Sequence, residues 1–141
     1  MKPAILLRIA AIIMLLHTVG HTFGTLGWKK TTDPKKQEVI SQMTDNNFPF
    51  MGANHSFGDA MDGYGFTIIL ALLLDSILLW MMARSYKTAP QLTRNILIFL
   101  GVLLLLQGVL ELKYFFPLAA SFTLISAALT LIAVSQIKKA G

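Results

Sequence analysis

Four long apolar runs alternate with polar segments along this chain of 141 residues. Each run is close to the roughly 20 residues that a helix needs to cross about 30 Å of hydrocarbon. The apolar residues are continuous rather than alternating, and lipid leaves a backbone few options besides the helix. The pattern therefore predicts an all-α integral membrane four-helix bundle. Its predicted spans are residues 3–27, 64–83, 96–112 and 118–137.

The connections between these spans differ in length. Residues 84–95, with Pro90 as a helix breaker, join the second and third spans, and residues 113–117 join the third and fourth. Such short connections predict antiparallel neighbours. The outer loop between the first and second spans, residues 28–63, is too long for a bare connection, so we expect it to be functional or partly structured.

The first half of this loop predicts a short surface helix. Asp33 and Pro34 fit the N-cap and first position of a helix that runs to about Met43. The second half, residues 48–65, alternates aromatic residues with glycines. That composition is typical of a segment that lies in the headgroup layer or folds over the mouth of the bundle.

The composition agrees with a membrane protein, because 55% of the residues are hydrophobic, 13% are charged and the mean hydropathy is +0.63. A soluble chain of this size cannot bury so much apolar surface, so we expect residues 1–141 to form a single transmembrane domain in contact with membrane lipids. The absence of cysteine excludes disulfides and thiolate chemistry. The twelve basic residues are scattered between apolar runs, which predicts no nucleic-acid partner.

The orientation follows from how these basic residues divide between the two sides of the membrane. One side carries seven and the other carries five. The excess favours both termini in the cytoplasm, and we expect the membrane to be the bacterial inner membrane. The seven residues are Lys2, Arg8, Arg84, Lys87, Arg94, Lys138 and Lys139, and the five are Lys29, Lys30, Lys35, Lys36 and Lys113.

Ionisable groups inside the spans are the candidate chemistry, because burying one in hydrocarbon costs a few kcal/mol. His17 lies eleven residues from Trp28, and Asp75 lies eleven residues from Tyr64. If both aromatic residues mark the same interface, His17 and Asp75 share a depth of about 16 Å. The pair therefore predicts an oriented acid–base dyad for proton transfer near neutral pH.

Two further pairs with helical spacing extend this predicted pocket. His17 and His21 are four residues apart, as are Gln107 and Glu111, so each pair lies on one face of its helix. We expect Glu111 to act as a second carboxylate, and His21 and Gln107 to bind the polar head of a hydrophobic small molecule. The fourth span is expected to close the pocket with Thr123, Ser126, Ala127 and Thr130.

The loop and the first span add other candidates. His55 and Asp59 are four residues apart just before the second span, which places them as ligand-binding candidates at the mouth of the pocket. Gly20 and Gly24 form a small-xxx-small pair, which lets another helix approach closely and supports a homodimer.

Each of these signals also has a structural interpretation. His17 and Asp75 can form a hydrogen-bonded pair that only fixes the helix register. Glu111 lies close enough to the interface to extend to water. His55 and Asp59 fit an ordinary solvated loop.

No metal site is firmly indicated. The three histidines, His17, His21 and His55, are the ligands that a metal ion or haem would use. Thr18 stands where the helical zinc-protease motif places a glutamate after its first histidine. The sequence therefore predicts no particular cofactor, and both its presence and its identity stay unknown.

The four spans, the long first outer loop and the stretch Leu16–Gly24 (Leu-His-Thr-Val-Gly-His-Thr-Phe-Gly) together resemble a known group. The chain is similar to the small bacterial membrane proteins grouped around the DoxX-like families, and more remotely to EXPERA-type bundles. This resemblance implies quinone-linked redox work or sterol isomerisation, in which inward acids and histidines move protons. No defining family motif matches residue by residue, so no family site is transferred to this chain.

Three functions remain in competition. The first is a membrane enzyme that transfers a proton on a lipid-like or quinone-like molecule through His17, Asp75 and Glu111. The second is a protein that binds a metal ion or haem. The third is an accessory or scaffold subunit whose buried polar groups hold the bundle together.

Overall fold

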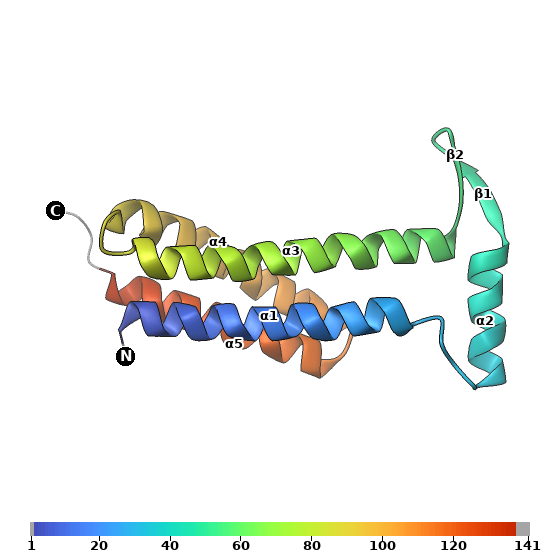
Figure 1. Cartoon of the computed structure of the whole chain (residues 1–141), viewed down its shortest axis with the longest axis horizontal. Coiled ribbons are helices and arrows are strands. Elements are labelled where there is room, and N and C mark those ends of the chain that lie inside the picture. Colours follow the sequence, from blue (N-terminus) through green and yellow to red (C-terminus); the bar gives the residue numbers. More distant parts are fainter. Residues whose placement is uncertain (1, 138–141) are drawn as a thin grey trace. The chain divides into compact units, whose positions relative to one another are not determined.

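The computed structural model describes residues 2–137, and four of its helices are long and apolar enough to cross a membrane. They are α1 (Pro3–Gly27), α3 (Phe57–Ser85), α4 (Pro90–Tyr114) and α5 (Pro117–Gln136) (Figure 1). The prediction of an all-α protein with a loop between the first two spans is confirmed. By the length and composition of these helices, the protein is an integral membrane protein. Lys138 and Lys139, counted above for orientation, lie outside the described residues.

The helices extend beyond the predicted spans, most of all at α3. This helix begins at Phe57, seven residues before the predicted start of the span, and contains 29 residues. The polar residues near its start obscure this extension in a hydropathy pattern, although they are compatible with a helix outside the hydrocarbon. The turns that join α3 to α4 and α4 to α5 each end at a proline at the first position of the next helix, where a missing N–H costs nothing.

The chain divides into two compact units. The first, here called the bundle unit, consists of the described parts of Met1–Thr18 and Leu72–Gly141. The second, the loop unit, is Val19–Ala71.

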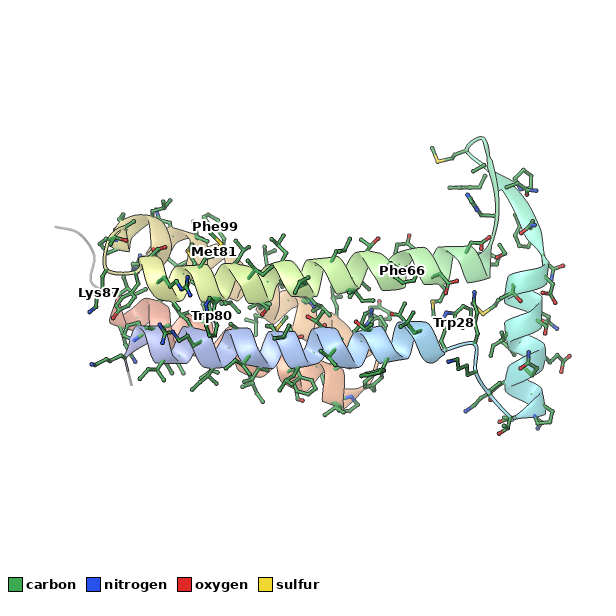
Figure 2. The ribbon with its side chains drawn as sticks, in the orientation of Figure 1. Trp28, Phe66, Trp80, Met81, Lys87 and Phe99 are labelled. Carbon is green, nitrogen blue, oxygen red and sulfur yellow. The ribbon has the colours of Figure 1, made fainter. Side chains whose placement is uncertain are left out.

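The bundle unit has a core of leucine, alanine and small polar residues. Leu7, Met14 and Leu72 are fully buried there, as are Leu97 and Ala127. Large apolar side chains on the outer faces are instead exposed, and Figure 2 shows Phe99 and Met81 among them. A soluble protein rarely exposes so much apolar surface, so these faces are suited to lipid.

Helices α4 and α5 form the closest packing in the bundle unit. A Cβ atom at Gly101 would lie 2.7 Å from the Leu131 side chain, and one at Gly108 would lie 2.6 Å from that of Leu124. Small residues at these positions let the two backbones approach, as is common between helices in membranes. The partner on α5 moves from Leu131 back to Leu124 as the glycine on α4 moves forward from Gly101 to Gly108, so the two helices are antiparallel.

Helix α1 joins the bundle unit through hydroxyl groups of two other helices. Ser76 of α3 donates to the carbonyl of Ala11 at 2.8 Å, and Ser126 of α5 donates to the carbonyl of Ala10 at 3.3 Å. In a medium without water, such bonds stabilise helix association by about 0.6 kcal/mol on average.

The loop unit contains the predicted surface helix, α2 (Pro34–Asp45). Its N-cap is Asp33, whose carboxylate accepts the backbone N–H of Lys35 at 2.9 Å, and Pro34 occupies the first turn. The prediction of a helix that begins here is confirmed, and the helix runs two residues beyond Met43. None of its side chains is buried, as expected for a surface helix.

A two-stranded hairpin, β1 (Asn47–Phe50) and β2 (Ala53–Ser56), follows α2. The sequence analysis predicted no strands in this segment. Met51 and Gly52 form the turn with φ of 48° and 86°, and two successive positive φ values are what a type I′ hairpin turn requires. Glycine adopts this conformation freely, whereas methionine at a positive φ is an uncommon residue, so the local pattern does not indicate the turn.

Candidate functional site

The polar interior of the bundle unit is centred on His17. This side chain is only 5% exposed, and its Nδ1 shares a hydrogen bond of 3.1 Å with Thr123 Oγ1 of α5. Its ring stacks on Phe122, with 5.7 Å between ring centres and 25° between planes. Contacts on both an edge and a face orient the imidazole within the bundle.

The small residues expected on the fourth span lie in this interior. Thr123, Ser126, Ala127 and Thr130 are all fully buried. Thr130 donates to the Ser126 carbonyl at 2.7 Å within α5, while the hydroxyls of Thr123 and Ser126 bond to α1. The hydroxyl groups are therefore used mainly to hold helices and backbone carbonyls.

A second polar pair lies near the end of α4. Gln107 Nε2 donates to Glu111 Oε1 at 2.8 Å, so the predicted shared face of these two residues is confirmed. Glu111 is 8% exposed, and within the described residues no hydrogen-bond donor reaches its other oxygen, Oε2. A buried polar atom without a partner is rare and requires an explanation.

Glu111 and His17 lie at the same end of the bundle unit. A Cβ atom at Gly108 would be 3.3 Å from the backbone nitrogen of Leu124, which gives the register between α4 and α5. Glu111 follows Gly108 by three residues, so it is level with about residue 121 of α5. This is about 3 Å along the axis from Thr123, the partner of His17. Within the described residues, no hydrogen bond joins Glu111 directly to His17.

Asp75 has a different position from the one that the aromatic spacing indicates. Its neighbour Ser76 bonds to Ala11, so Asp75 is level with about residue 12 or 13 of α1, roughly one helical turn from His17. The difference arises because Tyr64 lies well inside α3 and so does not mark the start of that helix. Asp75 is half-buried and has no hydrogen-bond partner among the described residues. The His17–Asp75 dyad therefore stays a prediction.

The other predicted site residues belong to the loop unit. His21 is half-buried on α1, and its role as a ligand contact stays a prediction. Gly20 and Gly24 are exposed, and a Cβ atom at either would meet open space, so the expected close approach of a helix is absent there in the part of the chain that the structure describes. The close approaches in this unit are instead at Gly65, where a Cβ atom would meet the side chain of Thr25, and at Gly58, where it would lie 2.7 Å from the side chain of Thr44. A homodimer through Gly20 and Gly24 stays a prediction.

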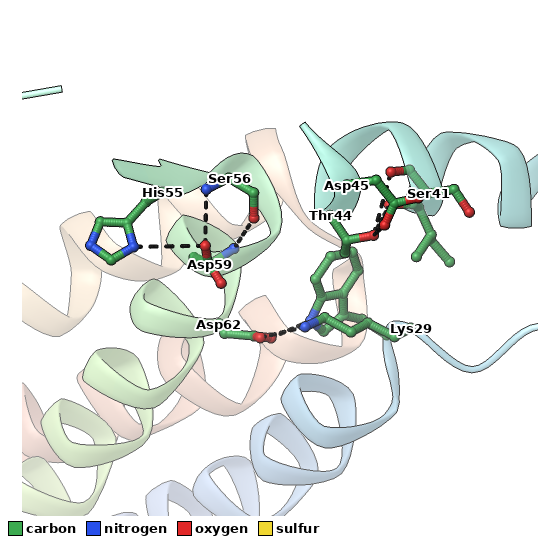
Figure 3. Close-up of polar contacts among 10 residues, drawn as sticks. Lys29, Ser41, Thr44, Asp45, His55, Ser56, Asp59 and Asp62 are labelled. Atoms are coloured by element: carbon green, nitrogen blue, oxygen red, sulfur yellow. Dashed lines mark hydrogen bonds and ion pairs between the residues drawn. The ribbon is translucent and has the colours of Figure 1, made fainter. Parts of the chain in front are cut away.

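His55 and Asp59 lie on the hairpin and the first turn of α3 (Figure 3). The backbone N–H of Ser56 donates to Asp59 Oδ2 at 2.9 Å, and the N–H of Asp59 donates to Ser56 Oγ at 3.0 Å. This reciprocal arrangement is a capping box that begins α3, and the spacing Ser56-x-x-Asp59 was a signal for it in the sequence. His55 Nδ1 lies 3.7 Å from Asp59 Oδ2, with both side chains exposed.

Asp62, a third polar residue of the loop that was expected beside His55 and Asp59 at the mouth of the pocket, is a positioning residue whose partners were not predicted. Its two oxygens accept the indole N–H of Trp28 at 2.7 Å and the ammonium of Lys29 at 2.6 Å. These bonds tie the residues after α1 to the second turn of α3. No local sequence pattern predicts these contacts, because Lys29 and Trp28 are 33 and 34 residues from Asp62 in the chain.

A metal centre has no support from these positions. Among residues 2–137, no three histidine, cysteine, aspartate or glutamate side chains form a group of the kind that holds a metal ion. The bundle unit instead contains two buried polar pairs, His17 with Thr123 and Glu111 with Gln107. In each pair, one side chain can gain or lose a proton and the other only forms hydrogen bonds.

Comparison of the chain with protein-family models, with curated proteins and with solved structures finds no match. The resemblance to DoxX-like and EXPERA-type proteins therefore stays a prediction.

Proposed function

We propose that His17 and Glu111 form an intramembrane acid–base site that exchanges protons with a small membrane-soluble molecule of the lipid, quinone or isoprenoid class. The observation that carries the proposal is the buried Oε2 of Glu111, which no donor of the described chain reaches. A hydroxyl group on the head of a ligand would donate a hydrogen bond to this oxygen. A carbonyl group would accept one from it when the carboxyl group is protonated. Gln107 holds the other carboxylate oxygen and so orients the group.

The two groups have suitable chemistry for this role. Imidazole and carboxyl groups are the common general acids and bases of proteins, and contacts with Thr123 and Phe122 orient the ring of His17. One member of the pair accepts a proton from the ligand while the other donates one, so the summed charge of the pair is unchanged by the exchange. The same two transfers in reverse, on the next ligand molecule, restore the initial protonation state of each group. Asp75 remains a third candidate for proton exchange, and His21 remains a candidate contact for the ligand.

Native mass spectrometry of the detergent-purified protein, combined with lipid extraction, tests the proposal. We expect the wild-type chain to retain a hydrophobic small molecule at a near-stoichiometric level, and Glu111→Gln and His17→Ala to lose it. Glu38→Gln is the matched control, because Glu38 is exposed on α2 and belongs to no predicted site, and it should retain the molecule. An empty wild-type protein, or equal retention by Glu111→Gln and Glu38→Gln, would contradict the proposal.

A scaffold role is the second candidate, and the interhelical hydroxyl bonds favour it. Ser76 and Ser126 both donate to the backbone of α1, so much of the buried polarity fastens helices together. If this is the main role, His17→Ala and Glu111→Gln will lower the melting temperature and no bound molecule will be found.

We further propose that both termini face the cytoplasm and that the membrane is the bacterial inner membrane. The support is the sequence count, in which seven of the twelve basic residues belong to the predicted side of the termini, two of them (Lys138 and Lys139) outside the described residues. The choice of a bacterial membrane rests on the resemblance described above.

A further inference from the structure

Arg8 and Trp80 form a cation–aromatic pair on the surface of the bundle unit. The guanidinium carbon of Arg8 on α1 lies 5.8 Å from the centre of the Trp80 ring on α3. Both side chains are exposed, Trp80 by 40%. The bond between Ser76 and Ala11, about one helical turn further along both helices, shows that α1 and α3 are direct neighbours here. Trp80 is labelled in Figure 2, as is Lys87 at the same end of this unit.

The hydrogen-bond donors of this pair have no acceptor within residues 2–137. No hydrogen bond or salt bridge uses the Arg8 guanidinium, and none uses the indole N–H of Trp80; the two salt bridges among the described residues lie in the loop unit. A guanidinium presents five N–H groups in a fork that matches a phosphate group, and the adjacent indole N–H supplies one more. The pair is therefore a set of donors without an acceptor in the part of the chain that the structure describes.

The surrounding charge has one sign. Lys2, Arg84, Lys87 and Arg94 accompany Arg8 at this end of the bundle unit. Among the described residues of the bundle unit, the nearest acid along the helices is Asp75, which forms no salt bridge, and the other acid, Glu111, lies near the far end of α4.

The spacing along the helices places these side chains at the edge of the hydrocarbon. Arg8 lies six residues from Lys2 at the start of α1, and Trp80 lies four residues from Arg84 near the end of α3. Both side chains are therefore within one to two helical turns of the basic end of the bundle unit. A long arginine side chain extends from that depth to the level of the lipid phosphates.

We propose that Arg8 and Trp80 bind the phosphodiester headgroup of an anionic phospholipid in the surface between α1 and α3. Arg8 donates to the phosphate oxygens as a fork, and the indole N–H of Trp80 donates to a further oxygen. The positive charge without neighbouring acids selects an anionic lipid over a zwitterionic one, because the choline or ethanolamine ammonium is repelled. This site is independent of the interior acid–base site.

Native mass spectrometry with added lipid tests the site. Purified wild-type protein in detergent is titrated with phosphatidylglycerol or with phosphatidylcholine of the same chain length, and we expect tighter binding of phosphatidylglycerol. Arg8→Gln should lower the affinity for phosphatidylglycerol by about fivefold to tenfold. Trp80→Phe keeps the ring but loses the N–H group, and should lower the affinity by a smaller factor.

The matched control is Lys113→Gln. Lys113 also lies near an aromatic ring, 4.9 Å from the centre of Tyr114, but at the other end of the span, so its removal should leave phosphatidylglycerol affinity unchanged. Glu111→Gln, which tests the interior site, should leave it unchanged as well. Equal affinities for the two lipids, or Arg8→Gln affinity equal to that of Lys113→Gln, would overturn the proposal. If Arg8→Gln fails to fold, unchanged binding by Trp80→Phe overturns it.

Discussion

His17 in the bundle unit and His55 in the loop unit lie in opposite surroundings. His17 is buried, shares a 3.1 Å hydrogen bond with Thr123 and stacks on Phe122. His55 is exposed, and its Nδ1 lies 3.7 Å from Asp59 Oδ2 in an ion pair whose two side chains are both exposed. An exposed pair of this kind contributes little to stability, whereas a buried polar group depends strongly on its partner. The same residue type therefore has very different structural importance in the two units.

The carboxylates of Asp62 and Glu111 differ in the same way, one partly exposed and the other buried. Asp62 has donors on both oxygens and is partly exposed, so water can replace either donor when one is removed. Glu111 is buried and has a donor on only one oxygen. Asp62 of the loop unit is thus well satisfied and replaceable, while Glu111 of the bundle unit is buried and poorly replaceable. Function is better sought in the bundle unit for this reason.

The largest expected effect is at the α4–α5 contact of the bundle unit. Gly108→Ala should destabilise the protein by about 2 kcal/mol, because the new methyl group collides with Leu124. Gly20→Ala in the loop unit is the control, since its Cβ meets open space, and it should change stability by less than about 0.5 kcal/mol. Unfolding in mixed detergent and SDS micelles, followed by circular dichroism, measures both. Equal stabilities of the two variants would contradict the close packing of α4 and α5.

A smaller effect is expected at the hydrogen bond of His17. Thr123→Val keeps the shape of the side chain but removes the hydroxyl, and should cost about 0.6 to 1.7 kcal/mol. Thr67→Val is the control, because Thr67 is exposed and its hydroxyl bonds only within its own helix, to the Gly63 carbonyl. The same unfolding assay compares the two. If Thr67→Val is as damaging as Thr123→Val, burial does not distinguish the two units.

The smallest effect is expected at Asp62. Asp62→Asn removes a negative charge that accepts from Trp28 and Lys29, and should cost less than about 1 kcal/mol. Because one bond is a partly exposed ion pair, this cost should shrink at high salt. Unfolding curves at low and high salt, with Glu38→Gln as an exposed control, measure the difference. A large cost that salt does not change would show that Asp62 behaves like a buried group.

Local features of the fold were predictable because they depend on residues close together in the chain. Asp33 and Pro34 begin α2 because an N-cap and a first-turn proline act on the adjacent backbone. Gln107 and Glu111 bond to each other because four residues are one helical turn. The capping box of Ser56 and Asp59 was equally local, and its spacing was sufficient to predict that α3 begins before the apolar run.

Contacts between helices were less predictable. The hydrogen bond between His17 and Thr123 depends on the register of α1 and α5. The close contacts between α4 and α5 are at Gly101 and Gly108, and α1 meets α3 at Gly65, whereas the small-xxx-small pattern indicated Gly20. Helices that are apolar on all sides, as lipid requires, have little polar contrast to show which face is turned inward.

The sequence by itself determined the membrane class, the four helices and the pairs of polar residues that share a helical turn. These properties follow from apolar run length and from the pitch of the helix. The tertiary structure alone decided which helices meet, which glycines allow the contact, and that one oxygen of Glu111 has no donor within the described residues. Those properties depend on helix rotation and register, which close packing between distant segments selects and local patterns do not encode.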